Sequence, residues 1–226
     1  MRLLLGDGMT APAELGVDDL VRLYAFPSAL DRAHVRANFV STLDGSAQGG
    51  DGRSGSINGP ADQFVFAVQR AQADVILVGA QTTRAEGYKP VVPEPWQREL
   101  RAELGLTAAP AIAVLTKSGL IDDELRAGGE APTLVYTDLG LEAVLDDLRG
   151  KGLRRVLCEG GPSVLAQVAA AGRLDELCLT VSPLVVGGHG LRIADGPELP
   201  QPWHPRLAHV IEADGMLLLR YTGSAA

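Results

Sequence analysis

The stretch "RRVLCEGGPSVLAQVAAAG", residues 154–172, places a carboxylate and two adjacent glycines between an apolar run and a helical run. Glycine lets the backbone approach a bulky ligand closely, and the free N–H groups at a helix N-terminus attract anions such as phosphate. A tight strand-to-helix turn explains the same residues equally well, because short glycine motifs give many false matches. The candidate ligand-binding residues here are Glu159, Gly160, Gly161, Pro162 and Ser163.

Polar residues follow three other apolar, strand-like runs. They are Asp44 in "VSTLDG", residues 79–83 in "GAQTT", and Thr116, Lys117 and Ser118 in "TKS". Because the carboxyl ends of parallel strands meet at one edge of a sheet, we expect these residues to share one rim. Lys117 with two hydroxyls has the chemistry to hold a phosphate monoester. The local alternatives are an Asp-Gly turn at Asp44 and a solvated loop lysine at Lys117.

The elements that must position these residues alternate between strands and helices. Asp214-Gly215 separates two further apolar runs near the C-terminus and predicts a hairpin. We therefore expect an α/β fold with a mainly parallel central sheet, helices on both faces and antiparallel C-terminal strands. Near-continuously apolar runs, typical of strands covered on both faces, lie at 35–42, 73–80, 111–116, 132–137, 154–159 and 176–186. Helical spacing lies at 59–72, 138–152 and 162–172, with Pro60 and Pro162 at first helical positions and Asp138 as an N-cap.

Composition excludes several classes of function. The net charge is −8 and no block of Lys and Arg occurs, which argues against a nucleic-acid groove. No apolar run is long enough to span a membrane, and the two cysteines, Cys158 and Cys178, predict buried reduced thiols rather than a metal site. Neither a G-x-G-x-x-G fingerprint nor a P-loop is present. We expect a cytoplasmic protein with a single domain, residues 1–226, whose Gly-rich segment 41–60 is an active-site loop.

Three segments in this order resemble the reductase domain of riboflavin biosynthesis, the C-terminal half of the bifunctional pyrimidine deaminase–reductase, which has a dihydrofolate-reductase-like fold. They are "STLDG", "GRSGSINGPADQFVFAVQRAQADVILVGAQTTRAEGY" and "VLCEGGPSVLAQVAAAGRLDELCLTVSPLVVGG". The resemblance covers residues 35–226 and leaves 1–34 as an N-terminal extension without a zinc-deaminase signature. It implies a homodimeric, NADPH-dependent oxidoreductase. Such an enzyme transfers a hydride from nicotinamide C4 to the ribose C1′ of a ribosylamino-pyrimidine phosphate.

The resemblance also implies roles for particular residues. Asp44 and Glu86 would face the substrate as catalytic groups, with Asp44 orienting or protonating it. The Gly160–Gly161 peptide would be cis, as is common in dihydrofolate-reductase-like folds. Cofactor contacts would come from Gly79, Thr82 and Thr83, from the 159–163 segment for the pyrophosphate, and from Thr116, Lys117 and Ser118 for the 2′-phosphate. The substrate phosphate would be held by Arg53, Ser56 or Arg84.

Two candidate substrate-binding positions depart from the family's pattern. Asn38 stands where members usually carry a lysine, and Thr42 replaces the usual serine. "RAEGY" likewise replaces a more typical "RADDP". Two alternatives therefore stay open beside the pyrimidine reductase: reduction of dihydrofolate or another pterin-like compound on the same fold, and a nucleotide-binding protein that has lost catalysis.

Overall fold

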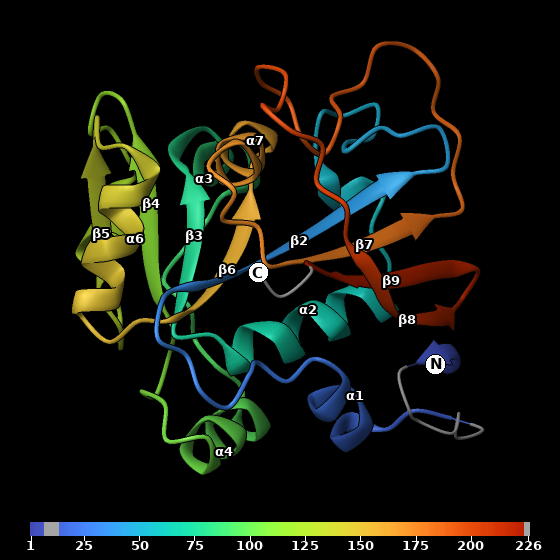
Figure 1. Ribbon diagram of the computed structural model, residues 1–226, viewed down its shortest axis with the longest axis horizontal. Coiled ribbons are helices and arrows are strands. Elements are labelled where there is room, and N and C mark those ends of the chain that lie inside the picture. Colours follow the sequence, from blue (N-terminus) through green and yellow to red (C-terminus); the bar gives the residue numbers. More distant parts are fainter. Residues whose placement is uncertain (7–13, 224–226) are drawn as a thin grey trace.

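The computed structural model, which describes residues 1–6 and 14–223, is a single sheet with helices on both faces (Figure 1). The strands are β1 (Arg2–Gly6), β2 (His34–Thr42), β3 (Val75–Gly79), β4 (Ala111–Thr116), β5 (Thr133–Thr137), β6 (Arg155–Gly160), β7 (Glu176–Ser182), β8 (Arg206–Ala213) and β9 (Met216–Thr222). The helices are α1 (Val17–Leu23), α2 (Pro60–Gln72), α3 (Ala80–Glu86), α4 (Pro95–Glu103), α5 (Asp123–Ala127), α6 (Leu141–Gly150) and α7 (Pro162–Ala170), with a short 3₁₀ helix at Ser54–Ser56.

The strand order is β1-β8-β9-β7-β2-β6-β3-β4-β5. The six strands from β7 to β5 in this order run parallel to one another. The pairs β7–β9, β9–β8 and β8–β1 are antiparallel. Asp214 and Gly215 join β8 to β9 with φ values of 52° and 79°, the backbone that a two-residue hairpin turn requires. The predicted α/β fold with antiparallel C-terminal strands is confirmed.

The parallel strands are apolar throughout because both faces of the sheet are covered. Val75 and Leu77 of β3 belong to the core beneath α6 and α7. Ile76 and Val78 face the other way and pack with Leu125 of α5. Helices α1 and α2 cover the β7, β8 and β9 part of the second face. Cys158 and Cys178 are buried free thiols, as predicted.

Local boundaries differ from the sequence-based expectation at both ends of several elements. Helix α6 begins at Leu141 with Gly140 as its N-cap, because Asp138 has a left-handed φ of 54° and lies in the preceding turn. Strand β7 ends at Ser182, since Pro183 cannot donate to a sheet. The N-terminal extension is built into the fold: β1 pairs with β8, and α1 packs beside α2. No helix of the described residues is long and apolar enough to cross a membrane.

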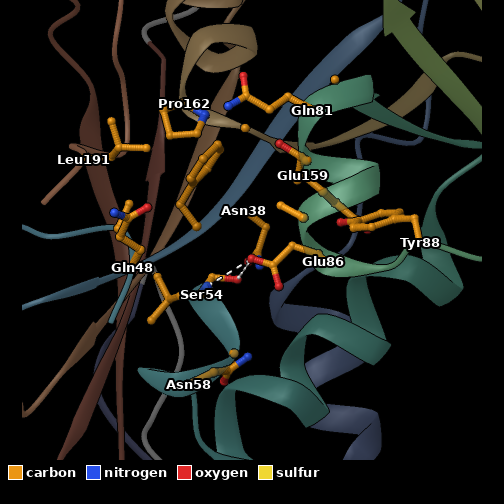
Figure 2. Close-up of a pocket in the computed structure, with 18 of the residues that line it drawn as sticks. Asn38, Gln48, Ser54, Asn58, Gln81, Glu86, Tyr88, Glu159, Pro162 and Leu191 are labelled. Carbon is orange, nitrogen blue, oxygen red and sulfur yellow. Dashed lines mark hydrogen bonds between the residues drawn. The ribbon is translucent and has the colours of Figure 1, made fainter. Parts of the chain in front are cut away.

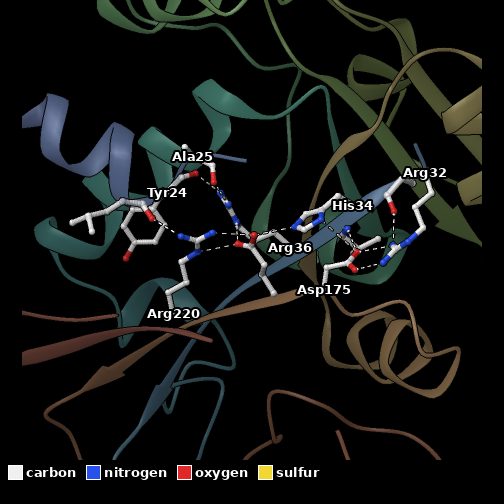
Figure 3. A network of polar contacts seen from close by, with 11 residues as sticks. Tyr24, Ala25, Arg32, His34, Arg36, Asp175 and Arg220 are labelled. Atoms are coloured by element: carbon white, nitrogen blue, oxygen red, sulfur yellow. Dashed lines mark hydrogen bonds and ion pairs between the residues drawn. The ribbon is translucent and has the colours of Figure 1, made fainter. Parts of the chain in front are cut away.

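A buried ionic network attaches the N-terminal extension to the sheet (Figure 3). The Glu176 carboxylate accepts hydrogen bonds from Arg36 Nε at 2.7 Å and Arg220 Nε at 2.9 Å, and His34 Nε2 lies 2.9 Å from its other oxygen. Burial acts to raise the pKa of Glu176, but attraction to Arg36 and bonds to His34 and Arg220 hold that pKa well below its usual value. The two guanidinium groups also donate to backbone carbonyls at the end of α1. Those carbonyls belong to Leu23, Tyr24 and Ala25.

We predict that Glu176→Gln destabilises the protein by about 3–5 kcal/mol, because it leaves the fully buried Arg36 without its counter-charge. Urea unfolding followed by circular dichroism measures this loss. Glu130→Gln, which breaks the exposed pair with Arg98, is the matched control and should leave unfolding nearly unchanged. Equal midpoints for the two variants would contradict the structural importance of the network.

Candidate active site

A cavity of about 480 Å³ opens at the carboxyl ends of β2, β3 and β6, where the sequence predicted a common rim (Figure 2). One wall is formed by β2, one face of α2 and the loop between them. The rest of the lining comes from α3 and the segment after it, from the first turn of α7 and from the loop after β7. The lining side chains used below are Asn38, Gln48, Ser54, Asn58, Asp62, Phe66, Arg70, Thr82, Glu86, Tyr88, Glu159, Ser163, Leu191 and Asp195.

The glycine pair after β6 lets the backbone itself form part of the cavity wall. The Gly160–Gly161 peptide is cis, as predicted, and Gly160 has a φ of 94°. A Cβ on Gly160 would lie 2.8 Å from Phe39 Cζ, and a Cβ on Gly161 would lie 2.5 Å from Thr82 Oγ1. Position 160 therefore requires glycine, whereas a Cβ at Gly161, the N-cap of α7, would have to displace the Thr82 side chain. The result is a bare helix start that faces the cavity.

Glu159 is held in a hydrogen-bonded ion pair directly before the glycines. Arg70 donates to its two oxygens at 2.7 and 2.6 Å, and the Tyr88 hydroxyl donates at 2.7 Å. Burial raises the pKa of Tyr88 well above its usual value, and the charge of Glu159 raises it further. Burial works against the charge of Arg70, but Glu159 keeps the pKa of its guanidinium above the ordinary value. Glu159 is thus engaged structurally, and its oxygens are largely occupied by these donors.

Three other carboxylates line the cavity, Asp62, Glu86 and Asp195, and none has a salt bridge among the described residues. Asp62 accepts a hydrogen bond from the Thr180 hydroxyl, and burial raises the pKa of its carboxyl group. Glu86 accepts from the backbone N–H and hydroxyl of Ser54, both at 3.0 Å, as drawn in Figure 2. Such carboxylates can accept hydrogen bonds from a ligand or exchange a proton with it.

The structure brings part of the expected site together. The predicted residues that line the cavity are Asn38, Gly79, Thr82, Glu86, Glu159, Gly161, Pro162 and Ser163. The predicted residues outside the lining are Thr42, Asp44, Arg53, Ser56, Thr83, Arg84, Thr116, Lys117, Ser118 and Gly160.

Asp44 is exposed, lies outside the lining of the cavity and connects two loops. Its carboxylate accepts from the Thr42 hydroxyl at 2.5 Å and from the backbone N–H groups of Val186 and Gly187. The Thr42 and Gly187 bonds lower the pKa of this carboxyl group. Asp44 therefore fastens the loop after β2 to the loop after β7.

Other predicted residues are turned away from the cavity by local hydrogen bonds. The Thr83 hydroxyl donates to the Ala80 carbonyl within α3, and Ser56 donates to Asp51 within its loop. Arg84 Nη1 donates to the Leu120 carbonyl at 3.1 Å, which places Arg84 beside the loop after β4. Lys117 is exposed on that same loop.

Sequence reasoning missed the helix face that carries Asp62, Phe66 and Arg70. These residues stand at i, i+4 and i+8 of α2 and all line the cavity. An acid, an aromatic ring and an arginine at this spacing were a usable signal, because such residues share one helix face. Tyr88, Leu191 and Asp195 come from loops whose path no local pattern reveals. Among the described residues no group of His, Cys, Asp and Glu could hold a metal ion.

Comparisons with known proteins agree on one family. The family model of the RibD C-terminal domain matches residues 33–218. The 2,5-diamino-6-ribosylamino-4(3H)-pyrimidinone 5′-phosphate reductase of Methanothermobacter thermautotrophicus is 27% identical over 184 residues, which cover 73% of this chain and 85% of that protein.

Solved structures show the same fold. A pyrimidine reductase-like protein from Corynebacterium diphtheriae superposes with a TM-score of 0.75 at 24% identity, covering 86% of this chain and 93% of its own. Dihydrofolate reductase from Enterococcus faecalis, solved with NADP(H), superposes with a TM-score of 0.54 at 15% identity, covering 85% of this chain and 97% of its own. The fold is therefore dihydrofolate-reductase-like.

NADPH is the cofactor expected from the sequence resemblance, and we predict that Gly161→Ala weakens its binding by about 10-fold or more, since the added Cβ must displace Thr82 and intrude on the helix start. Fluorescence titration with NADPH measures this. Gly140→Ala is the matched control, because Gly140 is the N-cap of α6 and a Cβ there meets no atom within 4 Å. NADPH affinity equal to wild type in Gly161→Ala would exclude a cofactor contact at this backbone.

Proposed function

We propose a reductase function from one premise: the chain belongs to the RibD C-terminal domain family. The proposed reaction is NADPH-dependent reduction of a ribosylamino-pyrimidine phosphate, with the hydride passing from nicotinamide C4 to the ribose C1′. The observation that carries the proposal is the glycine-built start of α7 beside the cavity, because a backbone this bare suits a dinucleotide pyrophosphate. The name of the archaeal relative supports the reaction class.

The residues around the glycine pair fit a nicotinamide cofactor. A Cβ at Gly79 would lie 3.1 Å from Val164 of α7 and 3.9 Å from the backbone nitrogen of Gly161, so the starts of α3 and α7 meet closely. Backbone N–H groups there and the Thr82 and Ser163 side chains would hold the pyrophosphate. Lys117, flanked by Thr116 and Ser118, would hold the 2′-phosphate. The bound cofactor would supply the hydride.

The protein's own contribution would then be positioning and proton supply. Asp62 and Glu86 line the cavity and are placed to orient the acceptor, and the raised pKa of Asp62 suits a proton donor. Asp44 would act indirectly, by fixing the loops that border the cavity. The proposal retains the homodimer implied by the resemblance and the cytoplasmic location expected from the sequence.

The direct test is NADPH consumption with 2,5-diamino-6-ribosylamino-4(3H)-pyrimidinone 5′-phosphate, followed by the loss of NADPH absorbance and by identification of the ribitylamino product. Turnover with formation of that product is the expected result. Tight NADPH binding without consumption would contradict the reductase and support a protein that has lost catalysis.

We expect Lys117→Ala to weaken the binding of NADPH by about 10-fold or more and to leave the affinity for NADH unchanged, because only NADPH carries the 2′-phosphate. Dissociation constants for both cofactors measure this difference. The control is Lys151→Ala, whose lysine pairs with Asp147 at the opposite end of the strands. A parallel loss of affinity for both cofactors would remove Lys117 from the 2′-phosphate site.

A further inference from the structure

His209 is a buried histidine outside the cavity lining, and the proposed reaction does not involve it. Its Nε2 atom has no hydrogen-bond partner among residues 1–6 and 14–223. Two parts of the N-terminal extension adjoin it. Gly6 of β1 lies opposite it in the sheet, and the Tyr24 ring at the end of α1 packs against its ring in a T-shaped arrangement, with the two centroids 4.8 Å apart. The imidazole is therefore kept from water by β1 and α1.

Two guanidinium groups act on the charge of His209. Arg220 of β9 lies opposite it in the sheet, and Arg36 comes from β2. Burial lowers the pKa of the imidazole, and the charges of Arg220 and Arg36 lower it further, to about 4. Glu176 acts in the opposite direction. Its carboxylate cannot compensate fully, because it already accepts hydrogen bonds from both arginines and lies 2.9 Å from His34 Nε2.

The other titratable groups near this cluster offer no compensation. Tyr24 and Cys178 interact with the same two arginines, and burial raises the pKa of each side chain, so both are uncharged at neutral and acidic pH. Asp62 of α2 acts on Tyr24 and Cys178, and burial raises its pKa as well. A proton added to His209 would therefore create a third cation beside the arginines. It would also place an N–H at Nε2, where no described residue accepts it.

The same two guanidinium groups attach the N-terminal extension. Arg36 donates to the Tyr24 carbonyl at 2.7 Å, and Arg220 donates to the Leu23 carbonyl at 2.6 Å, both at the end of α1 (Figure 3). A protonated His209 would repel both groups and would need water as a hydrogen-bond acceptor. Strand β1 is at the edge of the sheet and α1 packs beside α2, so both can leave without separating the parallel strands. Water would thus reach the imidazole through this part of the fold.

We propose that His209 makes the attachment of the N-terminal extension sensitive to pH: protonation of its imidazole releases β1 and α1 while the parallel strands stay folded. The released state binds the proton more readily, because an imidazole exposed to water keeps a pKa of about 6.5. The attached state therefore keeps its stability above about pH 6.5 and loses it as the pH falls from there towards about 4. Carboxyl groups exposed to water titrate near pH 4, so they contribute little to a change between about pH 7.5 and about pH 5.

Hydrogen exchange of the whole chain, measured by mass spectrometry at about pH 7.5 and about pH 5 and corrected for the intrinsic pH dependence of exchange, tests the release. We expect peptides from β1 and α1 to lose protection by about 10-fold or more at the lower pH. A pKa of about 4 in the attached state and about 6.5 in the released state shifts the equilibrium by about 30-fold over this range. Peptides from β3 and β6 should stay protected. Unchanged protection of β1 and α1, or an equal loss in β3 and β6, would overturn the inference.

A variant without the titrating group assigns the effect to His209. His209→Phe keeps a ring against Tyr24 but cannot take up a proton, so its β1 and α1 peptides should be equally protected at both pH values. His204→Gln is the matched control, since His204 is exposed, and it should behave like the wild type. His209→Gln gives the same comparison with a smaller neutral side chain if phenylalanine disturbs the packing. A loss of protection in both His209 variants as large as in the wild type would exclude His209 as the cause.

Discussion

The ion pair between Arg70 and Glu159 fixes the relative positions of the elements that surround the cavity. The Glu159 side chain is 2% exposed, and a carboxylate so far from water is tolerated only when it is paired and hydrogen-bonded. Arg70 meets this need from α2, while Tyr88 meets it from the segment after α3. The guanidinium also lies 4.3 Å from the centre of the Phe66 ring. Strand β6, helix α2 and the end of α3 are thereby joined at one carboxylate, immediately before the glycine pair.

This ion pair holds together two sides of the cavity that offer different groups to a ligand. On the side of α3 and α7, close approach of backbone at Gly79 and Gly161 leaves helix starts exposed, which suits an anion without a fixed cation nearby. On the side of β2 and α2, Asp62 and Asn38 offer polar side chains within a buried wall. In the proposed function, a protein with a net charge of −8 would bind the dinucleotide through its backbone and keep carboxylates for the second ligand.

The sequence predicted the strands well because their burial on both faces produces apolar runs, and it predicted the glycine pair because its chemistry is local. It failed where distant segments decide the outcome. Asp62 and Gln69 are buried on α2 because they face the sheet, where Thr180 of β7 and Asn38 of β2 contact them, so polarity there does not signal exposure. Asp44 ends a strand at the expected rim, yet the returning segment at Val186 and Gly187 captures its carboxylate. No spacing along the chain shows either contact.

The pairing of β1 with β8 also determines what the sheet presents to other proteins. Without β1, the full length of β8 would offer unpaired N–H and C=O groups to any extended chain, which is a common route to aggregation. Strand β1, which forms the edge of the sheet in place of β8, has five residues and an irregular register between Leu3 and Leu5. A short, irregular margin is a poor template for further strand addition. The residues that precede the family match therefore cover an edge that β8 would otherwise present to solvent.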